Sequence, residues 1–253
     1  MFSNPKITDW QGKRVWLVGA SSGIGAAVAR ELAGRGARLA LSARSADKLA
    51  KLAIADALLL PCDATDVASL AAAREKLLAT LGGVDLVVYL AGDYVPMRAD
   101  NFDLAVAEQV VTVNFNAAMR LASTVLADLK PGGGIAFVAS VAGYRGLPKA
   151  LAYGPGKAAL IHFGEVLHLD LAPKGIGVWV INPGFVSTAL TAKNDFTMPA
   201  LLTPEQAAIA TVDGFKSANF EIHFPKRFTN VLKALSLLPY GWYFPLIRRF
   251  TGG

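Results

Sequence analysis

Short apolar runs alternate with helical stretches along most of the chain, and this alternation restricts the fold more than any other feature of the sequence. The runs that we predict as strands cover residues 13–19, 37–43, 57–62, 84–90, 134–140, 176–182 and 219–224. Strands separated by helices pair in parallel through right-handed crossovers. Most of the runs are nearly all apolar, as expected when helices cover both faces, whereas the last alternates and is predicted as an edge strand. The sequence therefore predicts an α/β fold with a doubly wound parallel sheet of about seven strands.

A glycine-rich turn follows the first predicted strand and precedes a helical stretch. A strand, such a turn and a helix N-terminus together form a phosphate cradle, because bare backbone N–H groups and the positive helix end face the anion. Many ordinary tight turns also contain several glycines, but here the flanking strand and helix favour a nucleotide site. The residues that we expect to contact the nucleotide are Gly19, Ser21, Ser22, Gly23, Ile24 and Gly25.

A tyrosine and a lysine stand four residues apart at the start of another helical stretch, as Tyr153 and Lys157, and Ser140 ends an apolar run thirteen residues before the tyrosine. Residues spaced by four share a helix face, so the ammonium can approach the phenol. A nearby cation lowers the tyrosine pKa from its usual value of about 10, which suits proton exchange with a reacting oxygen. Ser140 can hydrogen-bond the same oxygen if the intervening loop folds back. Taken alone, the tyrosine–lysine motif is more often an ordinary surface pair.

With both motifs present, the chain resembles the short-chain dehydrogenase/reductase family from about Lys13 to Phe224. The family's G-x-x-x-G-x-G motif corresponds to the three glycines of the turn. The resemblance implies a Rossmann-like fold and a catalytic set made of Asn114, Ser140, Tyr153 and Lys157.

The resemblance also implies further contacts to a nicotinamide cofactor. The family's P-G-x-V-x-T loop, which lies against the nicotinamide, corresponds to Pro183, Gly184, Val186 and Thr188. Asp63, followed by Ala64, matches the acidic contact to adenine, and Tyr153 and Lys157 also belong to the cofactor contacts. Ala91 and Gly92 would let the cofactor ribose approach.

Two departures from the family pattern stand out. The usual N-A-G is Leu90-Ala91-Gly92 here, so the asparagine's hydrogen bonds must be replaced or absent. Gly154-Pro155-Gly156 fills the space between Tyr153 and Lys157, and because proline is tolerated in a first helical turn, we predict that a helix starts there.

The length of 253 residues fits one doubly wound domain, and no low-complexity linker divides the chain. We expect one dinucleotide-binding and catalytic domain over residues 1–225, in which a lobe at about 185–217 covers the substrate. Residues 226–253 form a short hydrophobic, amphipathic C-terminal helical extension, called the extension below.

The second predicted strand ends in Ala43-Arg44, where an acidic residue would be expected to hold the ribose of NAD. A guanidinium suits a phosphate dianion, so we expect NADP(H) to be favoured over NAD(H), with Arg44 at the ribose phosphate. The alternative is that Arg44 stacks on adenine or faces water.

The sequence gives less support to a disulfide framework, a metal site or a nucleic-acid interface. Cys62 is the single cysteine, which excludes a disulfide framework and is compatible with a reducing compartment. His162, Glu165 and His168 recur at spacing three but spread around a helix, so we expect no metal site. The net charge of +6 comes with scattered basic residues, which an anionic cofactor or membrane surface explains more simply than nucleic acid.

The extension combines apolar and aromatic residues with basic ones and is too short and proline-broken for a membrane span. Two alternatives stay open: it packs on its own domain or on a second subunit, or it lies on an anionic membrane. Residues 1–11 are polar and do not resemble a signal peptide. We expect a cytoplasmic protein, associated with a membrane through its C-terminus under the second alternative, and a homo-oligomer, either a dimer or a tetramer.

These features favour an oxidoreductase that interconverts a carbonyl and a secondary alcohol by hydride transfer. The expected substrate-pocket positions are mostly apolar or aromatic, which favours a lipophilic substrate. They are Tyr94, Met97, Val141, Tyr144, Leu147, Phe185, Leu190, Phe196 and Met198. The alternative is a nucleotide-binding regulatory or scaffolding protein that kept the fold without the chemistry. The intact catalytic set argues against this alternative, and Leu90 argues weakly for it.

Overall fold

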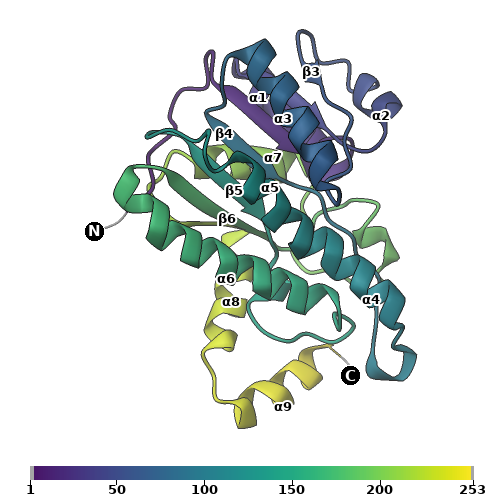
Figure 1. Ribbon diagram of the computed structural model, residues 1–253. Coiled ribbons are helices and arrows are strands. Elements are labelled where there is room, and N and C mark those ends of the chain that lie inside the picture. Colours follow the sequence, from purple (N-terminus) through teal and green to yellow (C-terminus); the bar gives the residue numbers. More distant parts are fainter. Residues whose placement is uncertain (1–2, 252–253) are drawn as a thin grey trace.

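The computed structural model describes residues 3–251 and contains a seven-stranded sheet in the order β3-β2-β1-β4-β5-β6-β7 (Figure 1). Every neighbouring pair is parallel. The strands are β1 (Arg14–Val18), β2 (Arg38–Ser42), β3 (Leu58–Leu59), β4 (Leu86–Tyr89), β5 (Gly134–Val138), β6 (Gly177–Pro183) and β7 (Glu221–Phe224). Each lies within a predicted run except β6, which extends one residue further to Pro183, and β7 is an edge strand as predicted.

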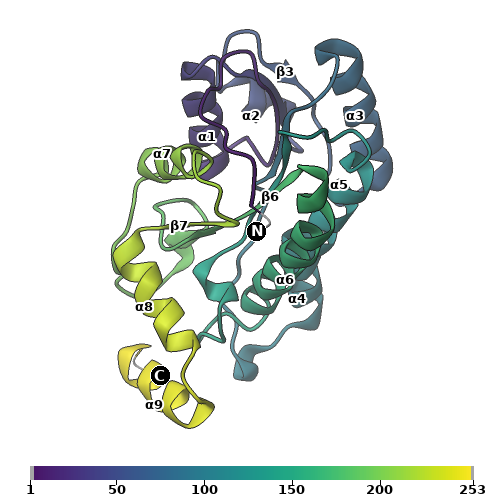
Figure 2. The same ribbon diagram turned by 90° about the vertical axis from the view of Figure 1, so that its left-hand side faces the viewer.

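Helices cover both faces of the sheet, which confirms the doubly wound prediction (Figure 2). α1 and α7 lie together on one face, and α3, α4, α5 and α6 lie on the other. The bounds are α1 (Gly23–Gly34), α2 (Ala46–Ala50), α3 (Val67–Leu81), α4 (Leu104–Val111), α5 (Ala117–Val125), α6 (Tyr153–Leu171), α7 (Pro204–Gly214), α8 (Lys226–Ser236) and α9 (Tyr240–Thr251).

Capping residues fix where two of these helices begin. The Asp66 side chain accepts a hydrogen bond from the Ala68 amide at the start of α3. Thr203 and Gln206 form a capping box at the start of α7, with Pro204 in the first turn. Both caps satisfy amides that a helix would otherwise leave unpaired.

The strand order reverses at β1, because β2 and β3 continue the sheet on one side of it and β4 on the other. In open parallel sheets a ligand crevice forms at such a reversal, outside the carboxyl ends of the strands. The loops that follow β1, β4, β5 and β6 carry the predicted motifs and meet at this edge.

The extension forms the end of the molecule that lies away from α1 and α3 (Figures 1 and 2). α8 packs beside β7, and α9 follows after a short turn. No helix within residues 3–251 combines the length and apolarity needed to cross a membrane.

Candidate active site

A cleft of about 660 Å³ opens at the carboxyl ends of the central strands. Its lining includes every catalytic and cofactor-binding residue predicted from the sequence. These residues are Gly19, Ser21, Ser22, Gly23, Ile24, Gly25, Arg44, Asp63, Ala64, Ala91, Gly92, Asn114, Ser140, Tyr153, Lys157, Pro183, Gly184, Val186 and Thr188. A shallower hollow of about 900 Å³ between α1 and the segment after α2 contains none of them.

The glycine-rich turn is closely packed against its neighbours. Gly19 has a φ of +99°, and a Cβ built on it would lie 2.3 Å from the Ala91 amide nitrogen. A Cβ on Gly25 would lie 2.2 Å from the Gly19 carbonyl oxygen. Ser22 caps α1 without a side-chain hydrogen bond, so amides of the first turn remain available to a ligand. The turn therefore has the shape and polarity of an anion cradle.

Charged side chains line the part of the cleft beyond this turn. Asp63 Oδ1 accepts hydrogen bonds from the Thr65 amide at 2.8 Å and the Thr65 hydroxyl at 2.7 Å. These bonds, with a smaller contribution from Arg44, hold the Asp63 pKa below its usual range. Lys48, in the first turn of α2, lines the cleft as a second cation beside Arg44. It was not predicted, although its position one helical turn after Arg44 is a signal that the sequence contains.

Tyr153 is the first residue of α6, as predicted from the Gly154-Pro155-Gly156 sequence. A Cβ on Gly154 would lie 3.3 Å from the Ala142 carbonyl oxygen, and a Cβ on Gly156 would lie 3.5 Å from Asn114 Cβ. The small residues therefore let α6 lie against the loop after β5. This close approach brings Tyr153 next to the loop that contains Ser140.

Lys157 is buried behind the tyrosine. Its Nζ lies 5.6 Å from the centroid of the Tyr153 ring and donates a hydrogen bond to the Val138 carbonyl at 2.9 Å. Burial lowers the Lys157 pKa to about 7. Burial therefore makes the Lys157 ammonium lose its proton far more readily than an exposed lysine does.

The Tyr153 pKa differs from the expectation based on its spacing from Lys157. Burial raises it, while the hydrogen bond with Ser140 acts in the opposite direction. Because the phenol is removed from water and the Lys157 amine is bound to a carbonyl, desolvation outweighs any attraction to the cation. In this structure the tyrosine is thus a protonated group.

Ser140 caps the short helix at Val141–Gly143, where its Oγ accepts a hydrogen bond from the Ala142 amide at 3.1 Å. The hydroxyl proton is not used in that bond, so Ser140 can donate it to Tyr153 or to an oxygen that binds beside Tyr153. A buried hydroxyl held in this way can polarise an oxygen placed beside Tyr153.

Asn114 lies in a π-helical segment, Thr112–Asn116, between α4 and α5. Its Nδ2 donates to the carbonyls of Asp93 at 2.7 Å and Val110 at 2.8 Å. Its buried Oδ1 has no hydrogen-bond partner among the described residues and would lie 3.2 Å from a Cβ on Gly92. Because buried polar atoms are normally paired, this oxygen marks a position for a ligand group or a water in the cleft.

Leu90 occupies the position of the family's asparagine. Its amide donates to the Val18 carbonyl at 2.7 Å, and its side chain packs partly against the core. A hydrophobic contact therefore stands where the family has an amide side chain.

Of the predicted substrate-pocket positions, Leu190 lines the cleft, and three aromatic positions make ring contacts. Tyr94 contacts Tyr153 edge-on, with ring centroids 5.1 Å apart. Phe185 lies 5.7 Å from Phe196 within the lobe and 5.6 Å from Phe228 of α8. The start of the extension therefore packs against the segment that begins at Phe185.

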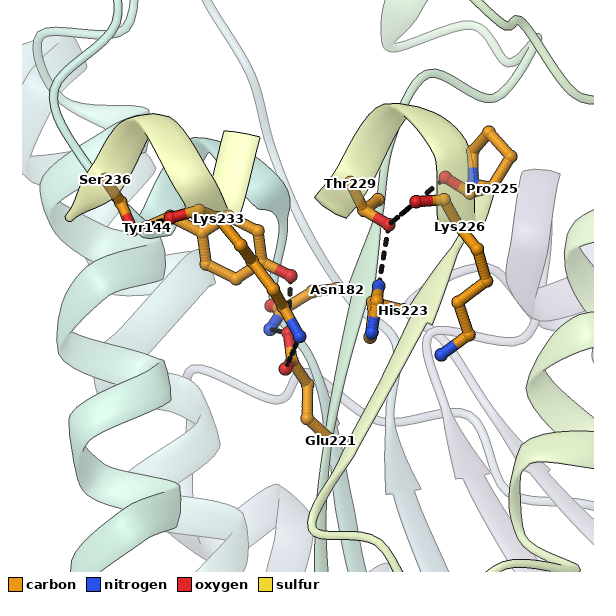
Figure 3. Close-up of polar contacts among 9 residues, drawn as sticks. All are labelled: Tyr144, Asn182, Glu221, His223, Pro225, Lys226, Thr229, Lys233 and Ser236. Atoms are coloured by element: carbon orange, nitrogen blue, oxygen red, sulfur yellow. Dashed lines mark hydrogen bonds and ion pairs between the residues drawn. The ribbon is translucent and has the colours of Figure 1, made fainter. Parts of the chain in front are cut away.

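A polar cluster that was not predicted joins the extension to two loops of the cleft (Figure 3). The Glu221 carboxylate receives hydrogen bonds from Tyr144, from Lys233 of α8 and, at 2.7 Å, from Asn182. Burial alone would raise the Glu221 pKa, but these donors outweigh it and hold the pKa below its usual range. Tyr144 follows the Ser140 loop and Asn182 precedes Pro183, so the cluster connects α8 to both loops.

The histidines considered as metal ligands have other contacts. His162 lies 3.4 Å from Glu165, and His168 packs against Phe220 with ring centroids 5.2 Å apart. Within residues 3–251, no group of three or more His, Cys, Asp or Glu side chains is arranged to hold a metal ion.

Comparisons with known proteins agree with this geometry. The sequence matches the family model described as short chain dehydrogenase over residues 13–198. It is 33% identical over 192 residues to the 3-oxoacyl-[acyl-carrier-protein] reductase FabG of Escherichia coli, covering 72% of this chain and 77% of that protein. It is 30% identical over 228 residues to the ketoacyl reductase HetN of a Nostoc species, covering 85% of this chain and 79% of that protein.

A solved short chain dehydrogenase from Burkholderia cenocepacia, in complex with NADP, superposes with a TM-score of 0.76 at 25% identity. The match covers 85% of this chain and 96% of that one. A doubly wound sheet with a nucleotide cleft at its reversal defines the class of Rossmann-like dinucleotide-binding proteins. Within that class, the chain belongs to the short-chain dehydrogenase/reductase family, and it is an NAD(P)-dependent oxidoreductase acting on CH–OH and C=O groups.

Replacing the buried lysine should affect stability and activity in opposite directions. Burial lowers the Lys157 pKa from 10.5 to about 7, and this shift reduces the free energy of unfolding most strongly below pH 7. Each unit of the pKa difference between the folded and unfolded chain corresponds to about 1.36 kcal/mol. Between these pKa values the unfolded chain binds more protons, so wild-type stability rises with pH. We expect Lys157→Met to be more stable than wild type by an amount on the order of a few kcal/mol at pH 6, to lose this advantage towards pH 9.5, and to lose turnover.

Urea denaturation across this pH range measures the effect. Lys76→Met, at an exposed position of α3, serves as the control and should leave the pH dependence of stability unchanged. A constant stability difference between wild type and Lys157→Met at every pH would contradict the assigned Lys157 pKa.

Proposed function

We propose that this oxidoreductase reduces a lipophilic ketone, or oxidises the corresponding secondary alcohol, with NADP(H) preferred over NAD(H). The observation that carries the proposal is the convergence of the catalytic set and two cations, Arg44 and Lys48, on one cleft. The unpaired Asn114 oxygen and the tightly packed glycine turn fit a dinucleotide. When bound, a reduced nicotinamide would supply a hydride to the carbonyl carbon.

In this proposal Tyr153 donates its proton to the carbonyl oxygen, so that hydride and proton together give the alcohol. The raised Tyr153 pKa suits an acid that keeps its proton until a negative charge develops on that oxygen. Ser140 donates its free hydroxyl proton to the same oxygen and stabilises the developing charge.

Lys157 uses one of its three donor positions on the Val138 carbonyl, which leaves the others for the nicotinamide ribose and for Tyr153. A bound dinucleotide carries negative charge, which favours the ammonium form and so helps Tyr153 release its proton. Asn114 Oδ1 would hold a water between Lys157 and solvent.

The lipophilic substrate class rests on Tyr94, whose ring contacts Tyr153, and on Leu190, which lines the cleft. Relatives named as a ketoacyl reductase and a 3-oxoacyl-[acyl-carrier-protein] reductase also point to carbonyls attached to apolar chains. We further propose a cytoplasmic homo-oligomer, either a dimer or a tetramer.

A panel of methyl ketones of increasing chain length, a 3-ketoacyl thioester and a polar keto sugar tests the proposal with NADPH and NADH. We expect kcat/KM to rise by up to about fourfold per methylene that becomes buried, because each contributes about 0.8 kcal/mol. The measurement is the rate of nicotinamide oxidation, with the keto sugar as the polar control.

Equal kcat/KM for the keto sugar and the long ketones would contradict the lipophilic class. Tight NADPH binding without turnover on any carbonyl or alcohol would favour a regulatory role.

A further inference from the structure

The outward side of the extension is aromatic, apolar and basic. Its exposed large side chains include Leu237, Trp242 and Phe250, with 85%, 69% and 72% of their surface accessible. We define the outer face of the extension as its exposed residues Leu237, Tyr240, Trp242, Phe244, Arg249 and Phe250; on α9 they extend from both flanks of the buried positions to the opposite side, where Trp242 and Arg249 lie. Exposed apolar patches of this kind on a folded protein mark interaction sites.

One narrow strip of α9 is packed against the domain. Tyr243 and Ile247, four residues apart, are buried, and the Tyr243 hydroxyl donates to the Gly146 carbonyl at 2.8 Å. The Arg145 guanidinium lies 4.1 Å from the Tyr243 ring centroid and donates to the Ser236 carbonyl at 2.9 Å. The residues of the outer face are therefore left outside the packing between α9 and the domain.

α8 is also fixed in place, which makes the outer face a defined surface rather than a frayed end. Lys233 is bound to Glu221, and the Thr229 hydroxyl lies 2.6 Å from His223 Nδ1 (Figure 3). Both partners, Glu221 and His223, belong to β7 at the sheet edge.

Charge indicates what covers the outer face. From residue 222 to the end, the sequence contains no Asp or Glu, and its basic residues are Lys226, Arg227, Lys233, Arg248 and Arg249. Trp242 and Arg249 are seven residues apart, so they lie on nearly the same side of α9. Tryptophan beside arginine on an exposed helix suits the boundary between lipid headgroups and acyl chains.

We propose that the outer face of the extension docks on the surface of an anionic lipid bilayer. α9 has twelve residues and an internal proline, Pro245, so it lies in the interface and does not span the membrane. The aromatic side chains enter the headgroup boundary while Arg227 and Arg249 contact anionic headgroups. This proposal does not rest on the proposed function, and its test does not use catalytic activity.

The tryptophans provide an intrinsic probe, because Trp10, Trp16 and Trp179 are buried and Trp242 is exposed. The full-length protein is mixed with vesicles of phosphatidylcholine alone or with about one quarter phosphatidylserine. We expect sedimentation with the anionic vesicles to exceed that with neutral vesicles by roughly tenfold or more, and to fall at high salt. Tryptophan emission should shift to shorter wavelength only on the anionic vesicles.

Point variants identify the residues that bind the anionic vesicles. Arg227→Glu/Arg249→Glu should abolish sedimentation, whereas Arg30→Glu/Lys76→Glu, with the same charge change on exposed positions of α1 and α3, should retain it. Trp242→Phe should still sediment but lose the emission shift. Unchanged circular dichroism and thermal transition keep the comparison independent of folding.

A second copy of the chain is the competing occupant of the outer face. If wild type ignores anionic vesicles, or if the Arg30→Glu/Lys76→Glu control loses as much binding as the extension variant, the proposal is wrong. A dimer that Trp242→Ser/Phe250→Ser converts to a monomer, together with no vesicle binding, would assign the face to a subunit contact.

Discussion

Tyr153→Phe should lower turnover by about two orders of magnitude or more while leaving NADPH affinity nearly unchanged. The substitution removes the proton that Tyr153 would donate and keeps the ring, whose edge-on contact with Tyr94 should persist. Single-turnover measurements with saturating NADPH separate the chemical step from binding, and NADPH affinity is measured by fluorescence titration.

Tyr240→Phe is the matched control, because Tyr240 is exposed on the extension and lies outside the cleft. This variant should retain wild-type turnover. Near-normal turnover of Tyr153→Phe would remove the tyrosine from the acid role, and a large loss of NADPH affinity would make it chiefly a binding residue.

Removing the two cations at the end of β2 should change cofactor preference. A charge-assisted hydrogen bond contributes roughly 1.5–3 kcal/mol, and Arg44 and Lys48 are exposed, so we expect values near the lower end. Arg44→Ala should weaken NADPH binding by roughly tenfold, and Arg44→Ala/Lys48→Ala by roughly a hundredfold. NADH binding should change little in either variant, since NADH has no phosphate at that ribose.

Arg38→Ala provides the control, because Arg38 is exposed at the opposite end of β2. Titrations with both cofactors at one fixed salt concentration measure the effect. Equal losses for NADPH and NADH would mean that Arg44 and Lys48 do not contact the ribose phosphate.

The sheet could be predicted from the sequence because its signals are local. Apolar runs, separated by helical stretches, identify buried parallel strands without knowledge of their neighbours. The start of α6 could also be predicted locally, because a proline such as Pro155 is tolerated in the first turn of a helix but not in its interior. The caps at Asp66 and Thr203 belong to the same class.

Features that depend on distant residues could not be predicted. The Tyr153 pKa is raised because several segments bury the ring, whereas the spacing to Lys157 suggested a lowered value. The π-helical segment around Asn114 leaves an oxygen unpaired, and its sequence, Thr112–Asn116, has no local mark of that geometry. The Glu221 cluster joins residues up to 89 positions apart, from Tyr144 to Lys233.

For the extension, the sequence left packing on the protein and contact with lipid as equal alternatives. The structure confirms packing on the same domain for one side, where Tyr243 and Ile247 are buried. The aromatic and basic side remains exposed. A single helix can thus pack on its own domain through some residues and leave others exposed for contact with lipid. Composition alone does not show which residues are buried and which are exposed.

The Glu221 cluster has a consequence for how the protein is made. A chain emerges from the ribosome N-terminus first, so Lys233 is synthesised after every residue of the cleft. Until it arrives, the Glu221 carboxylate lacks its cation and Tyr144 and Asn182 lack a fixed acceptor. The loops beside Ser140 and Pro183 would therefore reach their final positions only after Lys233 has been synthesised, so that chains released before that point would lack a finished cleft.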